Sequence, residues 1–256
     1  MNSDSYFAIG HSHHVCEDYA FAGPTACSKT PIAVVSDGCS TAPNTDIGSR
    51  ILTRAILLNY PLNLSESIRG AYQATKTLGL TFDSLFATIL TLEFTPENQI
   101  KAQVSGDGGV IARKRESQEL EVYWLNYCSN APEYLAYLLH TPSYSRFLDS
   151  FGNQKAAEIT TLGPDGEVKS SFAEFPEDLV YERYFDPADY DLIAVTSDGV
   201  DSFAGLGYID VIKRIMSFKN YKGEFVKRRV KRFLKEIAAE KIRHDDDVSL
   251  AAIYLK

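Results

Sequence analysis

The chain has 256 residues, of which 45% are hydrophobic and 23% are charged, and its formal net charge is −8. This is the composition of a globular protein with a sizeable core, and the excess of acids over bases argues against nucleic-acid binding. No apolar run reaches the ~18–20 residues that cross a bilayer, and the N-terminus has no signal-peptide pattern, so we expect a cytoplasmic protein without membrane contact.

Short segments rich in β-branched and aromatic residues recur along the chain, and several alternate in polarity as antiparallel strands do. In chain order we expect a strand at 31–36, helices at 46–60 and 66–78, strands at 84–94, 100–105, 110–113 and 120–127, a helix at 133–140, a strand at 191–197, helices at 208–218 and 224–242, and a strand at 248–255. Ser65 is the expected N-cap of the second helix, and the polar, turn-rich stretch 141–171 is predicted to be a loop or flap. Because no linker composition interrupts the chain, residues 1–256 are predicted to form a single domain.

The last predicted helix is strongly basic on one side. Val226, Val230, Phe233 and Ile237 recur at spacings of four, three and four, which places them on one face. The segment 213–243 holds 12 of the 26 bases and only 3 of the 34 acids. We interpret the basic side of this helix as a solvated surface rather than a partner-binding site.

Cysteine use excludes two classes of small scaffold. The four cysteines, Cys16, Cys27, Cys39 and Cys128, form no CxxC pair. They are therefore predicted to be reduced thiols rather than disulfides or zinc ligands.

Acidic residues gather where apolar strands are predicted to end. Three such segments stop at Asp-Gly, namely AVVSDG (33–38), QVSGDG (103–108) and AVTSDG (194–199); in addition, three aspartates (245–247) open the last strand and Glu17-Asp18 follow a His-rich loop. One Asp-Gly is an ordinary turn dipeptide, but three after apolar strands are not explained in this way. If these ends converge, the carboxylates repel one another unless cations lie between them, and oxygen ligands suit Mg²⁺ or Mn²⁺.

The same segments resemble the metal-dependent protein Ser/Thr phosphatases (PPM, or protein phosphatase 2C), especially short bacterial members. The matching segments are CEDYAF (16–21), VVSDG (34–38), SGDGGV (105–110), LIAVTSDGV (192–200) and DDDVSLAAIYL (245–255). They occur in the family's order and span nearly the whole chain. The resemblance implies an α+β fold, a four-layer sandwich of two antiparallel β-sheets flanked by α-helices.

The resemblance also implies a binuclear Mn²⁺ or Mg²⁺ site, with a role for each matching residue. Asp37 would bridge the two metals, and the Gly38 carbonyl and Glu17 would complete the first metal site. Asp198 and Asp246 would bind the second metal, and Asp107 with Asp198 would hold a possible third. Asp18 would support the metal-bound waters. The implied reaction is hydrolysis of phosphomonoesters by a metal-bridged water. The implied substrate is a phosphoserine or phosphothreonine protein, and we expect a monomer.

Two positions depart from the family pattern. His13 stands where the family usually has an Arg that grips the substrate phosphate, and Ser40 stands where some members have a His that protonates the leaving oxygen. A neutral imidazole lacks the charged, two-pronged donor set of Arg, so weaker phosphate binding is expected. Asp201 lies three rather than four residues after Asp198, so the acid that commonly follows is not assigned.

These departures leave a second reading, a phosphatase-like binding or regulatory module with weakened catalysis. Retention of the mutually repelling acids favours an active enzyme. Other phosphatase classes lack their nucleophile: Val35 and Thr196 stand where a haloacid-dehalogenase-type enzyme needs an Asp, and Thr45 stands where a Cys39-based tyrosine phosphatase needs an Arg.

Overall fold

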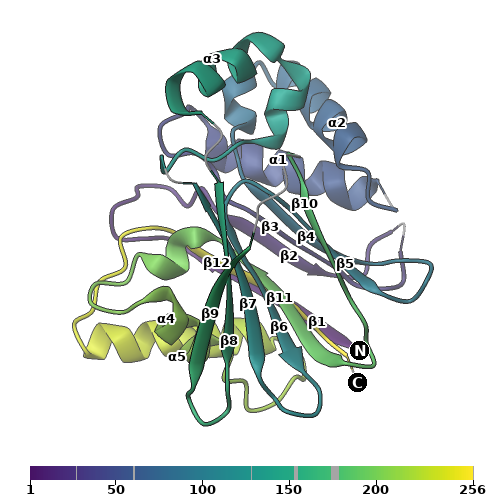
Figure 1. Cartoon of the computed structure of the whole chain (residues 1–256). Helices are drawn as coiled ribbons and strands as arrows, with labels where there is room; N and C mark the ends of the chain where they lie inside the picture. The colour runs from purple at the N-terminus through teal and green to yellow at the C-terminus, as the bar shows by residue number, and fades with distance from the viewer. Residues whose placement is uncertain (27, 60, 128, 153–154, 174–178, 256) are drawn as a thin grey trace.

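Two antiparallel sheets pack face to face, and helices cover both outer faces (Figure 1). The computed structural model describes residues 1–256 except 27, 60, 128, 153–154, 174–178 and 256. The expected α+β sandwich of two antiparallel sheets flanked by helices is confirmed. None of the described helices is both long enough and apolar enough to cross a membrane.

The two sheets contain seven and five strands. The larger sheet has the order β1 (Asn2–Ala8), β12 (Val248–Tyr254), β11 (Tyr190–Thr196), β6 (Gly108–Lys114), β7 (Leu120–Tyr127), β8 (Lys155–Leu162), β9 (Val168–Ala173). The smaller sheet has the order β10 (Tyr181–Phe185), β5 (Ile100–Ser105), β4 (Ile89–Phe94), β3 (Ile32–Ser36), β2 (Tyr19–Gly23). The chain crosses from the smaller sheet to the larger one in the short β5–β6 turn, which places that turn at one end of the sandwich.

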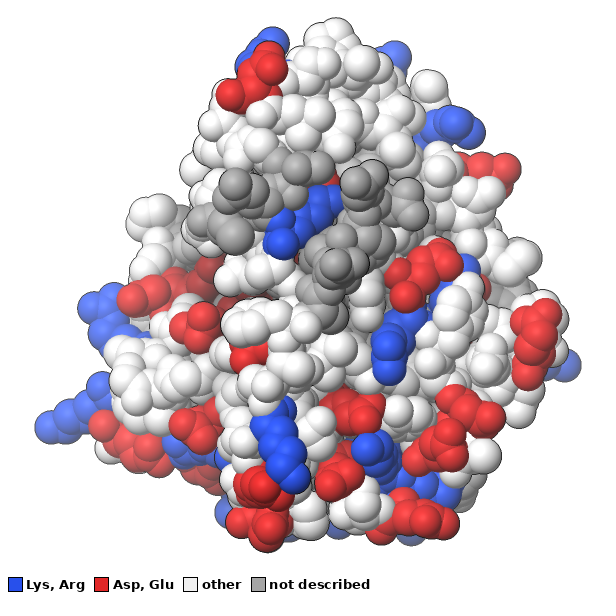
Figure 2. Space-filling model, viewed as in Figure 1, with Lys and Arg blue, Asp and Glu red and all other residues white. Residues whose placement is uncertain are grey.

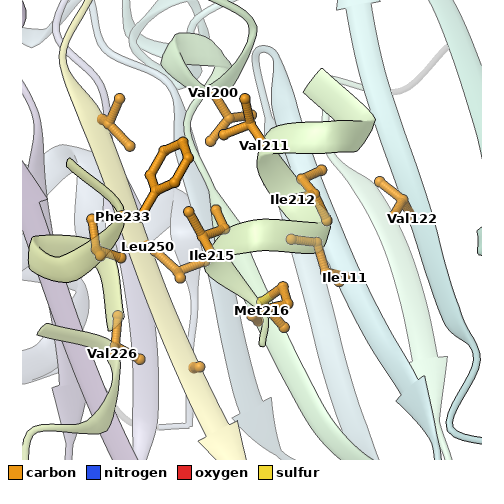
Figure 3. Close-up of a cluster of buried hydrophobic side chains, with 14 of the residues drawn as sticks. Ile111, Val122, Val200, Val211, Ile212, Ile215, Met216, Val226, Phe233 and Leu250 are labelled. Atoms are coloured by element: carbon orange, nitrogen blue, oxygen red, sulfur yellow. The ribbon is translucent and has the colours of Figure 1, made fainter. Parts of the chain in front are cut away.

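Three buried apolar layers hold the sandwich together. The central layer lies between the sheets and includes Val35, Leu92, Val195 and Ile253. Helices α1 (Thr45–Leu58) and α2 (Leu64–Thr77) cover the smaller sheet, and α4 (Tyr208–Ile215) and α5 (Phe225–Ala239) cover the larger one. Figure 3 shows part of this last layer, where the apolar sides of α4 and α5 meet the sheet.

Helix α5 has the two-sided character that its sequence predicts. Its buried residues are Phe225, Val226, Val230, Phe233 and Ile237. Lys231, Arg232 and Lys235 are exposed on the opposite side. On the face of the molecule shown in Figure 2, Lys and Arg side chains are interspersed with Asp and Glu side chains.

Several predicted elements differ from those observed. The prediction of a loop at 141–171 is wrong, because this stretch contains α3 (Thr141–Phe151), β8 and the first part of β9. Helix α3 forms because the His140 side chain accepts a hydrogen bond from the Ser143 backbone and Pro142 stands in its first turn, where no donor is needed. The predicted helix 133–140 is the 3₁₀ turn η2 (Leu135–Leu139).

Smaller errors concern element ends. The predicted strand 84–94 begins at Ile89, after the 3₁₀ turn η1 (Phe82–Leu85). Helix α2 is capped by the Asn63 side chain, which accepts a hydrogen bond from the Glu66 backbone, and not by Ser65. Cys16 and Cys39 are free thiols as predicted, whereas Cys27 and Cys128 lie outside the described residues.

Candidate metal centre

Four aspartates from separate strand ends line one pocket. Asp37 follows β3, Asp107 lies in the β5–β6 turn, Asp198 follows β11 in the 3₁₀ turn η3 (Asp198–Asp201), and Asp246 precedes β12. Antiparallel pairing puts these strand ends at the same end of the sandwich, and all four residues line a pocket of about 210 Å³. His13 and Gly38 line the same pocket, whereas Glu17 and Asp18 are not among the residues that line it.

The glycines of the Asp-Gly pairs permit close backbone approach. A Cβ at Gly38 would lie 2.9 Å from the Thr45 carbonyl oxygen, and a Cβ at Gly199 would lie 1.7 Å from the Asp247 carbonyl oxygen. Neither glycine has a positive φ, so neither is required by a left-handed turn. These two Asp-Gly pairs therefore serve tight packing around the pocket rather than a turn conformation.

Asp37 lies at the centre of the acidic cluster. Its side chain lies beside those of Asp18 and Asp198. Burial, and then the charges of Asp18, Asp198 and Asp246, raise the pKa of Asp37 well above its usual value. Burial and the charge of Asp198 do the same for the pKa of Asp107. The cluster therefore resists full ionisation unless positive charge enters it.

Two carboxylate oxygens in this cluster have no hydrogen-bond partner. Asp18 is fully buried; Ser197 Oγ donates to its Oδ2 at 2.8 Å, but its Oδ1 has no partner. Burial raises the pKa of Asp18 to about 7. Asp198 Oδ1 is likewise buried without a partner. Unpartnered buried acceptors are rare in folded proteins and point to a missing cation, water or donor.

Glu17 and His13 reach the cluster from the segment between β1 and β2. Thr45 Oγ1 donates to Glu17 Oε1 at 3.2 Å, close to Gly38. His13 Nε2 lies 3.5 Å from Asp246 Oδ1, and His13 Nδ1 lies 3.8 Å from Glu17 Oε2. Burial disfavours protonation of His13, but the adjacent carboxylates outweigh it and raise its pKa.

The sequence interpretation missed Asp247. Three consecutive aspartates have three different surroundings: the Asp245 side chain is 61% exposed and pairs with Arg243, Asp246 lines the pocket, and Asp247 is buried. The Asp247 carboxylate accepts backbone hydrogen bonds from Gly10 and Glu17. Adjacent aspartates look alike in the sequence, and only their packing separates them.

The remaining wall of the pocket carries uncharged groups. Ser40 and Thr41 follow Asp37, and Asn130, Pro132 and Tyr134 face them from the segment after β7. Ser40, which stands where some phosphatases have a His, lines the pocket and is exposed. The pocket therefore offers hydroxyl and amide donors beside its acidic base.

The donor set is suited to a hard divalent cation. Asp37, Asp107, Asp198 and Asp246 supply only oxygen, and unpartnered buried oxygens lie among and behind them. As the side chains stand, however, no three His, Cys, Asp or Glu residues among those described are arranged so that they could hold one ion. The oxygen ligands of the pocket fit Mg²⁺ or Mn²⁺. The side chains surround the pocket, but they do not converge on one position as the ligands of a single ion would.

Solved bacterial phosphatases share this fold. A bacterial serine phosphatase aligns with a TM-score of 0.57 and 14% identity, over 100% of this chain and 98% of its own. Stp1, a serine/threonine phosphatase from Staphylococcus aureus, aligns with a TM-score of 0.56 and 13% identity, over 100% and 96%. The S. agalactiae serine/threonine phosphatase aligns with a TM-score of 0.56 and 14% identity, over 99% of each chain.

No family model and no curated protein sequence matches this chain. The likeness to the solved structures therefore establishes the fold of the bacterial serine/threonine phosphatases, the PPM-like fold. At 13–14% identity the chemistry must be argued from the residues of this chain.

Proposed function

We propose that this protein is a Mn²⁺- or Mg²⁺-dependent phosphatase that hydrolyses phosphoserine or phosphothreonine in other proteins. The observation that carries the proposal is the meeting of Asp37, Asp107, Asp198 and Asp246 in one pocket at the end of a phosphatase-type sandwich. Bound cations would supply Lewis-acid activation of a water nucleophile and neutralise charge on the phosphoryl oxygens.

The residues of the chain divide into three roles. Glu17, Asp37 and the Gly38 carbonyl would hold one cation, Asp198 and Asp246 would hold a second, and Asp107 with Asp198 would hold a possible third. Asp18, which accepts from Ser197 Oγ and contacts Asp37, would fix the orientation of the Asp37 carboxylate. His13, which lines the pocket, would donate a hydrogen bond to the substrate phosphate.

The direct test measures release of phosphate from a phosphothreonine peptide and of nitrophenol from p-nitrophenyl phosphate. We expect turnover with Mn²⁺, no turnover after treatment with EDTA, and recovery when Mn²⁺ is returned in excess. Turnover that survives chelation would contradict a metal-dependent mechanism. Metal binding without turnover would favour the alternative function, a phosphatase-like regulatory module in which His13 and Ser40 have replaced stronger catalytic groups.

Metal removal should lower the stability of the protein as well as its activity. Cations offset the burial and the charge repulsion that raise the pKa of Asp37 and Asp107, so they bind the folded state in preference to the unfolded one. At free Mn²⁺ of 100 times Kd, one site adds about 2.7 kcal/mol, which corresponds to roughly 5–10 °C in Tm for a chain of this length. Differential scanning fluorimetry with Mn²⁺ and with EDTA measures the shift, and equal Tm values would count against a folded-state metal site.

His13 is expected to act on substrate binding. His13→Ala removes a donor at the pocket and should raise KM roughly tenfold, the effect of losing one hydrogen bond to a charged group. His13→Arg restores a charged, two-pronged donor and should lower KM below that of the wild type. His14→Ala is the matched control, because His14 is the exposed neighbour outside the pocket. An unchanged KM in both His13 variants would remove this residue from the substrate site.

A further inference from the structure

We propose that Asp247 is the positioning residue of this site. In this view it holds residues 10–18, here called the N-terminal loop, against the acidic pocket, and so sets the affinity of the metal site to which Glu17 belongs. The inference rests on the proposed metal-dependent function, and it assigns a role to a residue that the proposed reaction does not use.

The Asp247 carboxylate binds both ends of the N-terminal loop. Its Oδ1 accepts the Gly10 backbone N–H at 2.7 Å, and its Oδ2 accepts the Glu17 backbone N–H at 2.6 Å and the Asp18 backbone N–H at 3.4 Å. The side chain is 1% exposed, and it bonds residues 229 to 237 positions away in the sequence. One buried carboxylate therefore determines where the loop begins and where it ends.

Backbone contacts seat the loop on the same segment. The His11 backbone N–H donates to the His244 carbonyl at 3.0 Å, and the Ser12 backbone N–H donates to the Asp245 carbonyl at 3.1 Å. Gly10 packs so closely that a Cβ there would lie 2.4 Å from the Asp245 carbonyl oxygen. These contacts hold the first part of the loop. Its Glu17 end is held by Asp247 and by Ser49 and Arg50 of α1, which donate to the carbonyls of Glu17 and Cys16.

The functional side chains of the loop follow from this anchor. The adjacent residues Glu17 and Asp18 are both held through their backbone N–H groups, which donate to Asp247 Oδ2. His13 Nδ1 lies 3.2 Å from Asp247 Oδ2, which leaves Nε2 on the side of Asp246 and the pocket. Two acceptor oxygens are needed for this arrangement, because Gly10 uses one and Glu17 the other.

Asp247→Asn is therefore the informative substitution. It preserves size and shape but leaves a single acceptor oxygen and turns an NH₂ group toward one of the backbone donors. Isothermal titration of the full chain with Mn²⁺ should show one site weakened about 10–100-fold, the usual effect of losing a group that orients a metal ligand. The other site, which does not use Glu17, should change less, and kcat/KM at limiting Mn²⁺ should fall with the weakened site.

Two further variants separate positioning from charge and from stability. Asp245→Asn removes the same charge at a position two residues from Asp247, where the side chain is 61% exposed and pairs with Arg243. The Mn²⁺ affinity of this variant should stay within about twofold of the wild type. Gly10→Ala changes no charge but forces the loop away from the backbone of Asp245 and Asp246, so it should weaken the Mn²⁺ site of Glu17 and can also disturb the site of Asp246. If Asp247→Asn does not fold, Gly10→Ala tests whether displacing the loop weakens the Glu17 site, and wild-type Mn²⁺ affinity in that variant would overturn the inference.

Amide hydrogen exchange of the loop provides a readout that does not depend on metal or substrate. Exchange of residues 10–18 should become faster in Asp247→Asn and remain slow in Asp245→Asn. Wild-type Mn²⁺ affinity together with wild-type exchange in a folded Asp247→Asn variant would overturn the inference. If the wild type itself binds no Mn²⁺, the proposed function fails, and the exchange measurement alone decides whether Asp247 holds the loop.

Discussion

Asp37→Asn should reduce turnover of p-nitrophenyl phosphate about 1000-fold in saturating Mn²⁺, a loss at the upper end for one electrostatic group in an active site. This corresponds to roughly 4 kcal/mol of transition-state stabilisation. The large effect is expected because Asp37 lies beside Asp18 and Asp198 at the centre of the cluster, where the neutral amide of Asn could not replace the charged carboxylate that we propose as a cation ligand.

The same variant should not lose stability when metal is absent. In the metal-free protein the charge of Asp37 is opposed by burial and by its acidic neighbours, so a neutral side chain of equal size relieves repulsion. We expect the free energy of unfolding in EDTA, measured by urea denaturation, to be equal to or higher than that of the wild type. The stabilisation by Mn²⁺ should largely disappear.

Loss of activity without loss of metal-free stability distinguishes a metal ligand from a residue that merely supports the fold, because general damage lowers activity and metal-free stability together. Asp149→Asn is the control, because Asp149 is exposed on α3 and does not line the pocket. It should retain activity, stability and the response to Mn²⁺. Substantial turnover by Asp37→Asn would contradict both the proposed ligand set and the proposed mechanism.

The sequence predicts the well-buried central strands and misses the partly buried ones, which are the edge strands and β8. Segments such as 100–105 and 120–127 have the predicted bounds because their residues are largely buried and apolar, which makes their pattern clear. β1 and β10 were missed because their faces are only partly buried, so polar residues occupy them. β9 carries Phe172, which is 83% exposed, and its formation depends on pairing with β8 rather than on any pattern of its own.

The site residues likewise divide into those that the sequence predicts and those that it does not. Asp37, Asp107 and Asp198 were predicted because each ends a strand in a short motif, and sheet pairing brings strand ends together. The role of Asp247 was not predictable, because its bonds join positions more than 200 residues apart. Motifs identify candidate side chains at the strand ends, while the contacts that orient these side chains arise from tertiary packing.

A buried ion pair supports the wall of the pocket, and its disruption is the other large effect that we expect. Lys155, the first residue of β8, pairs with Glu133, and their side chains are 4% and 1% exposed. Tyr144 OH donates to Glu133 Oε1 at 3.0 Å, and the neighbours of Glu133 in the chain, Pro132 and Tyr134, line the pocket. The pair thus joins the segment after β7 to the larger sheet.

Lys155→Met should destabilise the protein by about 3–5 kcal/mol, because it leaves the Glu133 carboxylate buried without its cation. The double variant Glu133→Leu with Lys155→Met removes both charges and should recover most of this loss, since apolar pairs replace buried ion pairs at little cost. Urea denaturation of the two single variants and the double variant gives the coupling free energy directly.

Lys169→Met is the matched control, because the same substitution there breaks a pair with Glu167 whose side chains are 71% and 58% exposed. It should cost less than about 1 kcal/mol. If Lys155→Met costs no more than Lys169→Met, the buried pair does not hold the pocket wall in place. If it costs several kcal/mol and the double variant regains stability, the desolvated charge of Glu133 is the cause, and the position of Pro132 and Tyr134 at the pocket depends on its neutralisation.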